Sequence, residues 1–533
     1  MSELSPTSAA DSIESEPVAV NGAATVLRVT ADPSPHDLKR RTTHGALIST
    51  LAQAAALILR TGSTMVLARL LLPADYGLVG MTVAFTGFLG LFRDAGLSMA
   101  SVQRASITPA QTSTLFWVNL GVGVLLASLC AAIAPALAVF YHEPRLVWVT
   151  VVSGFGFVFN GASAQHRAML QRGMRFGALS VVDTVSLLLS IGMGIGLAAA
   201  GAKYWALVVM AITQPIAGAV GAWVATGWMP GWPQRGAEIG SMLWFGGTLT
   251  LNTTIVYIAY NMEKVLLGRY WGAETLGIYG RAYQLIYLPS DSLHGTISLV
   301  AFPALSRVQN DPVRLRSYFL KGYGLFLSLV MPIAVSCALF APDITLVFLG
   351  AKWHASAAVF RLLAPTVVAL ALINPFGSML LATGRVVRNL YIGLLVAPVV
   401  IIGYLAGLGH GPQGVAAGYS IAMVLLVVPV VLWAKRGTPI TATDILRTLK
   451  APFVSVLIAA AGMLAAVSLM ERIGPVFLRL VVESSLFFGL YAAMLLFGMK
   501  QKTTYLNILR ETGLWPISAW RQRAVRAESS EAP

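Results

Sequence analysis

Hydrophobic residues occur along this chain in long runs that are separated by short polar segments. Runs of roughly 20 residues recur from about residue 44 to residue 498, and a helix of that length crosses a bilayer core of about 30 Å. Backbone hydrogen bonds must be satisfied within a segment that lies in lipid, so each run is expected to be an α-helix. The pattern predicts an all-α polytopic membrane protein.

The runs divide into about fourteen transmembrane helices. The candidate spans lie at about 45–66, 77–95, 114–140, 146–165, 176–199, 204–226, 240–262, 278–303, 318–340, 357–382, 389–408, 414–433, 451–470 and 475–498. The predicted parts are a disordered cytoplasmic tail (1–43), an N-terminal lobe of six spans (44–226), an inter-lobe linker (227–239), a C-terminal lobe of six spans (240–434), two further spans (435–498) and a basic cytoplasmic tail (499–533).

One short segment occurs twice. "LARLLLPADYGLVG" (67–80) returns as "LGRYWGAETLGIYG" (267–280), closing the first and seventh spans. A shift of 200 positions pairs Arg69 with Arg269, Gly77 with Gly277 and Gly80 with Gly280. We interpret these residues as hinge or structural positions. Because six spans, an even number, separate the copies, the two lobes are predicted to be a parallel repeat with a cleft between them, which is the architecture of a transporter.

Composition and charge agree with this interpretation. The chain is 56% hydrophobic and only 11% charged, with a mean hydropathy of +0.74, whereas soluble domains carry about 25% charged residues. Most of the 37 lysines and arginines fall on one side when the N-terminus is placed inside and the spans alternate, as the positive-inside rule requires. The distribution of the basic residues therefore predicts the topology, with both termini cytoplasmic. The net charge of +15 follows from these topology-setting residues and does not indicate a nucleic-acid partner.

Several segments carry a family resemblance. They are "LARLLLPADYGLVGMTVAFTGFLGLFRDAGLSMASVQR" (67–104), "TSTLFWVN" (112–119), "HRAMLQRGMRF" (166–176), "YWALV" (204–208), "EKVLLGRYWGAETLGIYGRAYQL" (263–285) and "FPALSRVQND" (302–311). The chain thereby resembles the Wzx-type polysaccharide transporters, close to the WzxC/ExoT-like group, of the multidrug/oligosaccharidyl-lipid/polysaccharide flippase superfamily.

The resemblance implies two six-helix lobes in a V around a central cavity, followed by two extra helices. It implies a flippase of the bacterial inner membrane that moves undecaprenyl-diphosphate-linked oligosaccharide from the cytoplasmic to the periplasmic leaflet. The implied partners are this polyprenyl-diphosphate-linked oligosaccharide and membrane lipids, with a polysaccharide polymerase and export machinery as candidates. An ion-coupled multidrug or organic cation antiporter of the same superfamily is the alternative.

Polar side chains inside the first span are the first candidates for cargo contact. Gln53 and Arg60 fall on one helical face together with Ser49 and Thr64. Arginine within a span is a functional candidate, and its planar guanidinium can hold a phosphate with two parallel hydrogen bonds. Arg60 is interpreted either as a ligand of the diphosphate or as a structural ion-pair or snorkelling residue.

The eighth span carries a second polar stripe, which consists of Arg281, Gln284, Tyr287, Asp291 and His294. Aromatic and amide groups suit sugar contacts, so this stripe is a candidate cavity lining; for Asp291 and His294 a polar packing network is the alternative.

Three further polar residues in the spans allow more than one interpretation. Asn252 of the seventh span is a cavity candidate, and Glu263 on the same face is expected to form an interfacial pair with Lys264 near the outer end. Asp183 in the fifth span is either an ion-coupling site, like Asp291, or a carboxylate that packs helices together.

The sequence predicts neither a metal nor a cofactor, and no enzyme activity. Cys130 and Cys337 both lie in apolar runs, which favours packing residues over a metal or disulfide pair. No nucleotide-binding G-x-x-x-x-G-K-[ST] motif occurs, so transport is expected to be downhill or coupled to an ion gradient. A membrane polymerase or glycosyltransferase is disfavoured because the predicted outer loops are short.

Overall fold

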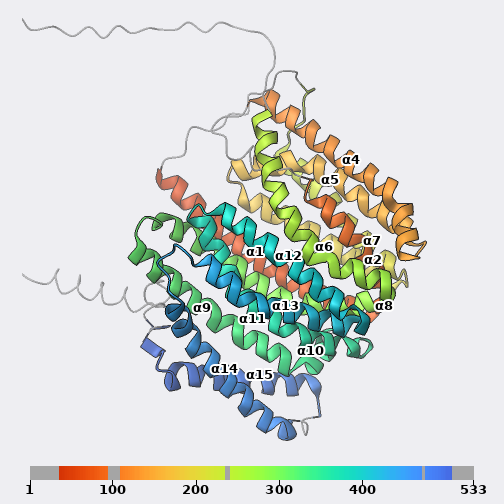
Figure 1. Cartoon of the computed structure of the whole chain (residues 1–533). Helices are drawn as coiled ribbons and strands as arrows, with labels where there is room; N and C mark the ends of the chain where they lie inside the picture. The colour runs from red at the N-terminus through yellow and green to blue at the C-terminus, as the bar shows by residue number, and fades with distance from the viewer. Residues whose placement is uncertain (1–34, 94–107, 234–239, 471–473, 504, 507–533) are drawn as a thin grey trace, which may run out of the picture.

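The described structure consists of helices. The computed structural model describes residues 35–93, 108–233, 240–470, 474–503 and 505–506, with side chains described apart from those at 35–49, 240–253, 255–256, 288–294, 296–302 and 467–470. All regular secondary structure in these ranges is helical (Figure 1), as the hydrophobic pattern predicts.

The helices can be grouped by the predicted lobes and the predicted terminal pair. The N-terminal lobe contains α1 (Pro35–Leu70), α2 (Pro73–Gly90), α4 (Pro109–Tyr141), α5 (Leu146–Arg172), α6 (Phe176–Ala199) and α7 (Tyr204–Thr226). The C-terminal lobe contains α8 (Gly240–Arg307), α9 (Pro312–Leu339), α10 (Ala341–Phe348), α11 (His354–Ala382), α12 (Val386–Gly407) and α13 (Gly411–Ala434). The terminal pair is α14 (Ala442–Met470) and α15 (Val476–Ala493).

Each of the fourteen predicted spans corresponds to a helix or to half of one. Ten described stretches are long and apolar enough to cross a membrane, and one of them, Val386–Ala434, contains both α12 and α13. The other three predicted spans are α2 and the two halves of α8, which bend apart at Gly272, where φ is +78° and ψ is −178°. The prediction of an all-α membrane fold with about fourteen spans is confirmed.

At two boundaries a described element reaches past the predicted division, and one short helix was not predicted. Helix α1 begins at Pro35, inside the segment 1–43 that was predicted to be a disordered tail. Residues 499–506, predicted as tail, instead pack on the protein through Tyr505, which shares a hydrogen bond with Ser328 of α9. The short helix α10 was not predicted, since eight residues are too few for a span.

The helix starts are specified by local sequence. Proline occupies the first turn of α2, α4 and α9, where its missing N–H costs nothing. The Asp75 side chain accepts a hydrogen bond from Leu72 N at 3.0 Å, and Asp311 accepts from Val313 N and Arg314 N. These caps satisfy N–H groups that a helix end would otherwise leave without partners.

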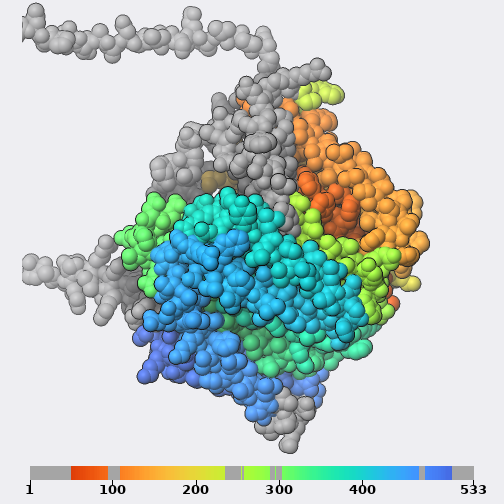
Figure 2. All heavy atoms as spheres, viewed as in Figure 1, coloured from red at the N-terminus to blue at the C-terminus, as the bar shows by residue number. Residues whose placement is uncertain are grey.

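Figure 1 shows α4–α7 gathered on one side of the molecule and α9 and α11–α13 on the other. Within the second group α12 and α13 pack especially closely, since a methyl group on Gly407 or Gly418 would overlap a carbonyl oxygen of the facing helix. Small residues allow such approach between helices in lipid. Figure 2 shows α14 and α15 (blue) along the flank of the C-terminal lobe, away from the orange N-terminal helices.

The largest hydrophobic core is shared by the two lobes at one end of the molecule. Met81, Tyr141 and Val208 from the N-terminal lobe join a cluster that is otherwise formed mainly by α8–α13. Tyr141 is the last residue of α4, and Val208 lies in the second turn of α7. In the predicted topology both positions are outer ends of helices, so the two lobes join at the side that we predict to be periplasmic.

Candidate functional site

The two copies of the repeated segment contact each other directly. A methyl group on Gly77 of α2 would overlap the carbonyl oxygen of Ala273, and one on Gly277 of α8 would overlap the carbonyl oxygen of Pro73. Ala273 is the residue 200 positions after Pro73, so the contact is reciprocal. Reciprocity of this kind is the property of an interface built on a twofold axis. The repeat therefore forms the joint between the lobes, which we call the outer junction.

Local geometry brings the two glycines together. The chain turns between α1 and α2 at Leu71–Leu72, and it turns within α8 at Gly272, where the positive φ favours glycine. Because the turns occupy equivalent positions in the repeat, the helices that leave them can cross at Gly77 and Gly277. The backbones approach closely because neither position carries a Cβ.

A segment of the C-terminal lobe also holds the end of α1. The Trp353 indole N–H donates to Ala68 O at 2.8 Å, and Lys352 Nζ donates to Arg69 O at 3.0 Å. The Arg69 guanidinium donates in turn to Val347 O of α10 at 2.9 Å. Trp353 is fully buried. These three hydrogen bonds cross between the lobes and close the outer junction at its α1 edge.

Arg281 lies at the edge of the outer junction as a partly buried cation. Its guanidinium carbon is 4.2 Å from the centre of the Tyr76 ring of α2, and Tyr76 packs edge-on against Trp353 with 5.3 Å between ring centres. Arg281 Nε is buried and has no hydrogen-bond partner among the described residues. A desolvated cation–π contact is worth about 2 kcal/mol or more, so Arg281 both bridges the lobes and retains hydrogen-bonding capacity.

A ladder of tyrosines continues from Arg281 along α8. Tyr283 and Tyr287 stack with 4.0 Å between ring centres, and the Tyr287 hydroxyl lies 2.9 Å from that of Tyr419 in α13. Gln284 Oε1, one turn beyond Arg281, is buried without a hydrogen-bond partner among the described residues. The predicted stripe of the eighth span thus packs within the C-terminal lobe at Tyr287 and faces the junction at Arg281.

Glu263 lies beside its predicted partner Lys264 and is deeply buried. It is 0% exposed, and neither carboxylate oxygen has a hydrogen-bond partner in the described structure. Its nearest cation is Lys264, with 4.0 Å between Nζ and Oε1. Glu263 is therefore a buried acid of the C-terminal lobe, and its predicted pairing with Lys264 is present.

Of the other predicted residues, Gln53, Arg60 and Asp183 lie apart from the junction, whereas Arg269 contacts the N-terminal lobe. Gln53 and Arg60 are exposed on α1, and neither side chain forms a hydrogen bond or ion pair with a described residue. Asp183 of α6 pairs with Arg167 of α5 at 2.8 Å, which is the arrangement expected of a packing carboxylate. Arg269 lies 5.7 Å from the centre of the Phe140 ring at the end of α4.

For four predicted positions the described structure gives no contact at the outer junction. The side chains of Asn252, Asp291 and His294 lie outside the described residues. Gly280 is described, and a methyl group there would meet no atom within 4 Å, so this position differs from Gly277 although both belong to the repeat.

Several residues of the outer junction were not predicted from the sequence. Tyr76 lies inside the repeated segment and could have been inferred once the two copies were expected to meet. Trp353, Lys352 and Val347 carry no comparable signal, because they lie more than 270 residues from their partners in α1. Only the fold brings these partners together.

Comparisons with known proteins extend these observations. A protein family described as "Polysaccharide biosynthesis protein" matches residues 66–358. The chain is 25% identical over 398 residues to the lipopolysaccharide biosynthesis protein WzxC of Escherichia coli (strain K12), covering 73% of this chain and 80% of that protein.

Two solved structures are similar in fold. One is the lipid II flippase MurJ in an inward closed conformation, with a TM-score of 0.68, 13% identity, and coverage of 85% of this chain and 99% of that one. The other is an inward-facing multidrug resistance MATE family transporter, with a TM-score of 0.58, 14% identity, and coverage of 74% and 96%.

Proposed function

We propose, from the premise that this chain belongs to the polysaccharide biosynthesis protein family, that it is a flippase for polyprenyl-diphosphate-linked oligosaccharide. The cargo would pass from the cytoplasmic to the periplasmic leaflet of a bacterial inner membrane. There it would become available to a polysaccharide polymerase and export machinery. The observation that carries the mechanism is the outer junction, where the two copies of the repeat hold the lobes together through reciprocal backbone contacts.

The physical need for a protein arises from the cargo headgroup. A diphosphate with attached sugars cannot enter hydrocarbon, because a buried unpaired charge is very costly. A cleft between the lobes that opens toward the cytoplasmic side would offer water, polar groups and cations instead. In this proposal Arg60 and Gln53 on α1, with Asn252 and the α8 stripe including Arg281, contact the headgroup.

Transport then requires the outer junction to open. Its three cross-lobe hydrogen bonds are each worth about 1 kcal/mol net, to which the glycine contacts and the cation–π contact add. A cargo can shift the equilibrium only through tighter binding to the open state. Arg281 is suited to this role, because a diphosphate that replaced Tyr76 as its partner would stabilise a separated junction.

The alternative, an organic cation antiporter, fits the described charges less well. Arg60 and Arg281 are cations without a carboxylate partner among the described residues, and they would repel a cationic cargo. An acidic ion-coupling site is still part of our proposal, with Asp183 and Asp291 as candidates. Efflux of organic cations from vesicles that contain the protein would support the antiporter instead.

Deletion of the gene tests the cargo. Cells without the protein should lose surface polysaccharide and accumulate a lipid-linked glycan on the cytoplasmic side of the membrane, and a plasmid copy should restore export. Normal polysaccharide export in the deletion strain, in the absence of a second such gene, would contradict the proposal.

A reversible cross-link tests the opening. A Cβ atom on Gly80 would lie 3.4 Å from Leu276 Cδ2, so these two positions face each other across the junction and suit a pair of cysteines, whose cross-link is checked by non-reducing electrophoresis. In a variant in which Cys130 and Cys337 are replaced by alanine, Gly80→Cys with Leu276→Cys should export polysaccharide only after reduction. Each single cysteine variant serves as the control. Full export by the oxidised double variant would show that the junction does not need to open.

A further inference from the structure

Four basic side chains gather where α12 begins and α13 ends, and we call them the inner basic patch. Arg385 and Arg388 lie at the start of α12, and Lys435 and Arg436 follow directly after the last residue of α13. None of the four side chains forms an ion pair with a described residue. In the predicted topology both helix ends are cytoplasmic, on the side opposite to the outer junction.

Two of these arginines converge on one backbone oxygen. Arg385 Nη1 donates a hydrogen bond to Arg436 O at 3.1 Å, and Arg388 Nη1 donates to the same oxygen. Arg385 Nη2 donates to the next carbonyl, Gly437 O. The two guanidinium groups therefore lie side by side with only a neutral carbonyl between them. Because like charges at short range repel each other, the arrangement favours an anion close to both.

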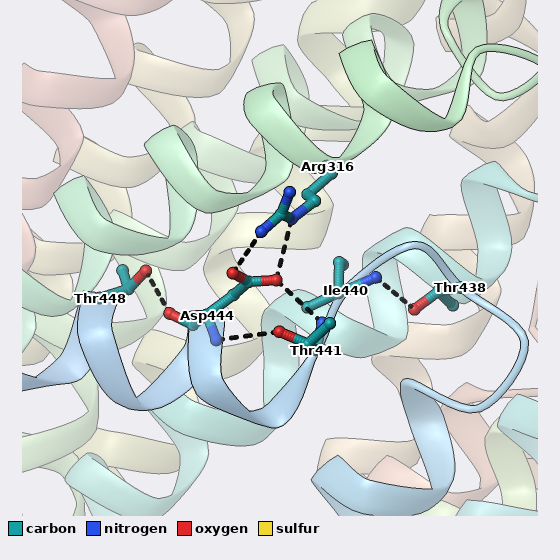
Figure 3. Close-up of polar contacts among 6 residues, drawn as sticks. All are labelled: Arg316, Thr438, Ile440, Thr441, Asp444 and Thr448. Carbon is teal, nitrogen blue, oxygen red and sulfur yellow. Dashed lines mark hydrogen bonds and ion pairs between the residues drawn. The ribbon is translucent and has the colours of Figure 1, made fainter.

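The acidic residue nearest to Arg436 along the chain is engaged elsewhere. This residue is Asp444, which forms a bidentate ion pair with Arg316 of α9, with 2.9 Å between Nε and Oδ2 (Figure 3). Asp444 also accepts a hydrogen bond from Thr441 N at 3.0 Å at the start of α14. Its charge is thus neutralised by Arg316, and the inner basic patch keeps its own positive charge.

The turn that carries Lys435 and Arg436 is held in place through its backbone. Thr438 Oγ1 donates to Lys435 O at 2.7 Å and accepts from Ile440 N at 3.4 Å (Figure 3). Gly437 has a φ of +68°, which favours glycine. The side chains of Lys435 and Arg436 take no part in these contacts, and Arg436 is exposed. The turn therefore presents two cations without depending on them.

Arg388 also keeps the edge of its guanidinium that suits a phosphate. Its Nη1 is used on Arg436 O, whereas its Nε and Nη2 form no hydrogen bond with a described residue. Arg316 uses these same two atoms for its bidentate contact with Asp444. A planar fork of this kind matches the geometry of a carboxylate or a phosphate, so Arg388 can hold an oxyanion with two parallel hydrogen bonds.

Exposed apolar side chains continue from the inner basic patch along both helices. They are Val387, Tyr391 and Leu394 on α12, and Leu425, Val428 and Leu432 on α13. Lys435 and Arg436 come three and four residues after Leu432, so they continue the same face of α13. A molecule that covers this surface needs an anionic head at the helix ends and an apolar tail along the helices.

We infer that the inner basic patch binds the phosphate of an anionic phospholipid, with Arg388, Lys435 and Arg436 on the phosphate. An acyl chain would lie along Tyr391 and Leu432. Clusters of basic residues directly cytoplasmic of transmembrane helices recognise anionic lipids in this way, and the predicted topology places both helix ends at that surface. The occupant is a lipid of the bilayer and not a soluble anion, because the apolar stripes begin directly at the cations.

Native mass spectrometry of the purified full-length protein tests the inference. The protein is mixed with phosphatidylglycerol or with phosphatidylcholine, and the bound lipid is counted. Lys435→Gln with Arg436→Gln should weaken phosphatidylglycerol binding at least about tenfold, since each basic residue near an anionic lipid contributes appreciably. The turn should stay folded in this variant, because Arg385 and Arg388 bind its carbonyl groups and not the replaced side chains.

Two further variants serve as controls. Arg175→Gln with Lys450→Gln removes two exposed cations on the same predicted side of the membrane but outside the patch, and it should leave phosphatidylglycerol binding unchanged. Lys435→Arg with Arg436→Lys preserves the charge of the patch and should retain the bound lipid at nearly the original level.

Several outcomes would overturn the inference. One is that the Lys435→Gln, Arg436→Gln variant and the Arg175→Gln, Lys450→Gln control bind phosphatidylglycerol equally, or that the charge-preserving variant loses it. Another is that phosphatidylcholine binds the original protein as well as phosphatidylglycerol does. A third is that inorganic phosphate or undecaprenyl diphosphate, at the concentration of the phospholipid, displaces the phospholipid. None of these readouts depends on transport, so the result is independent of the proposed function.

Discussion

Replacing Gly277 by alanine should open the outer junction. The new methyl group would overlap the carbonyl oxygen of Pro73 and would also lie 3.2 Å from Gly77 N. Both are backbone atoms of the opposite lobe and cannot rotate away. Overpacking of this kind costs about 1–3 kcal/mol. That cost applies only while the lobes are joined, so the open population should rise about 5- to 150-fold.

The same repeat provides a matched control. Gly280 lies one turn farther along α8, and a methyl group there would meet no atom within 4 Å. Alanine stabilises a helix by roughly 1 kcal/mol relative to glycine at either position. The difference between the Gly277→Ala and Gly280→Ala variants therefore isolates the contact between the lobes.

The opening can be measured by cysteine labelling from outside the cell. Leu71 is 2% exposed in the core that Trp353 forms with the end of α1, so Leu71→Cys reports on the junction once Cys130 and Cys337 are replaced by alanine. An impermeant maleimide should label this cysteine at least about fivefold faster in the Gly277→Ala background and at nearly the original rate in the Gly280→Ala background. Equal labelling rates in the two backgrounds would refute our account of the junction.

Three further predictions address other parts of the molecule. Arg60→Ala should abolish polysaccharide export while the protein still reaches the membrane, and Arg60→Lys should restore export only in part, since a point charge lacks the planar fork; normal export by Arg60→Ala would leave Arg281 as the cation to test. Trp353→Phe removes the hydrogen bond to Ala68 and should lower stability in detergent by about 1 kcal/mol or more, whereas Trp232→Phe, at an 85% exposed position, should have no effect on thermal unfolding. Reporter fusions after residues 20 and 520 should both report a cytoplasmic location, and a periplasmic signal from either would contradict the predicted topology.

The candidate site was only partly predictable. Repetition of the 67–80 segment identified Gly77 and Gly277 as structural positions, because each lies so close to the facing backbone that only glycine, without a Cβ, fits there. Arg281 was expected to line a cavity. The sequence did not indicate that its guanidinium would lie over the ring of Tyr76, which belongs to the other lobe. Glu263 was expected in a pair with Lys264 near the outer end of its span, and the pair is present, but the sequence did not indicate that the carboxylate is fully buried. Burial of that kind depends on which helix folds over a residue, and periodicity does not record it.

The sequence by itself determined the class of fold, the number of spans and the position of the two turns. Each of these depends on local physics, since lipid requires long apolar helices and a turn requires residues such as Pro73 or Gly272 that allow it. Tertiary structure alone decided that the two turns meet each other, that Trp353 and Lys352 hold the end of α1, and that Arg316 and Asp444 join α9 to α14. These contacts span from 128 to 285 residues of chain. They depend on backbone approach and burial, which arise only when separate helices pack together.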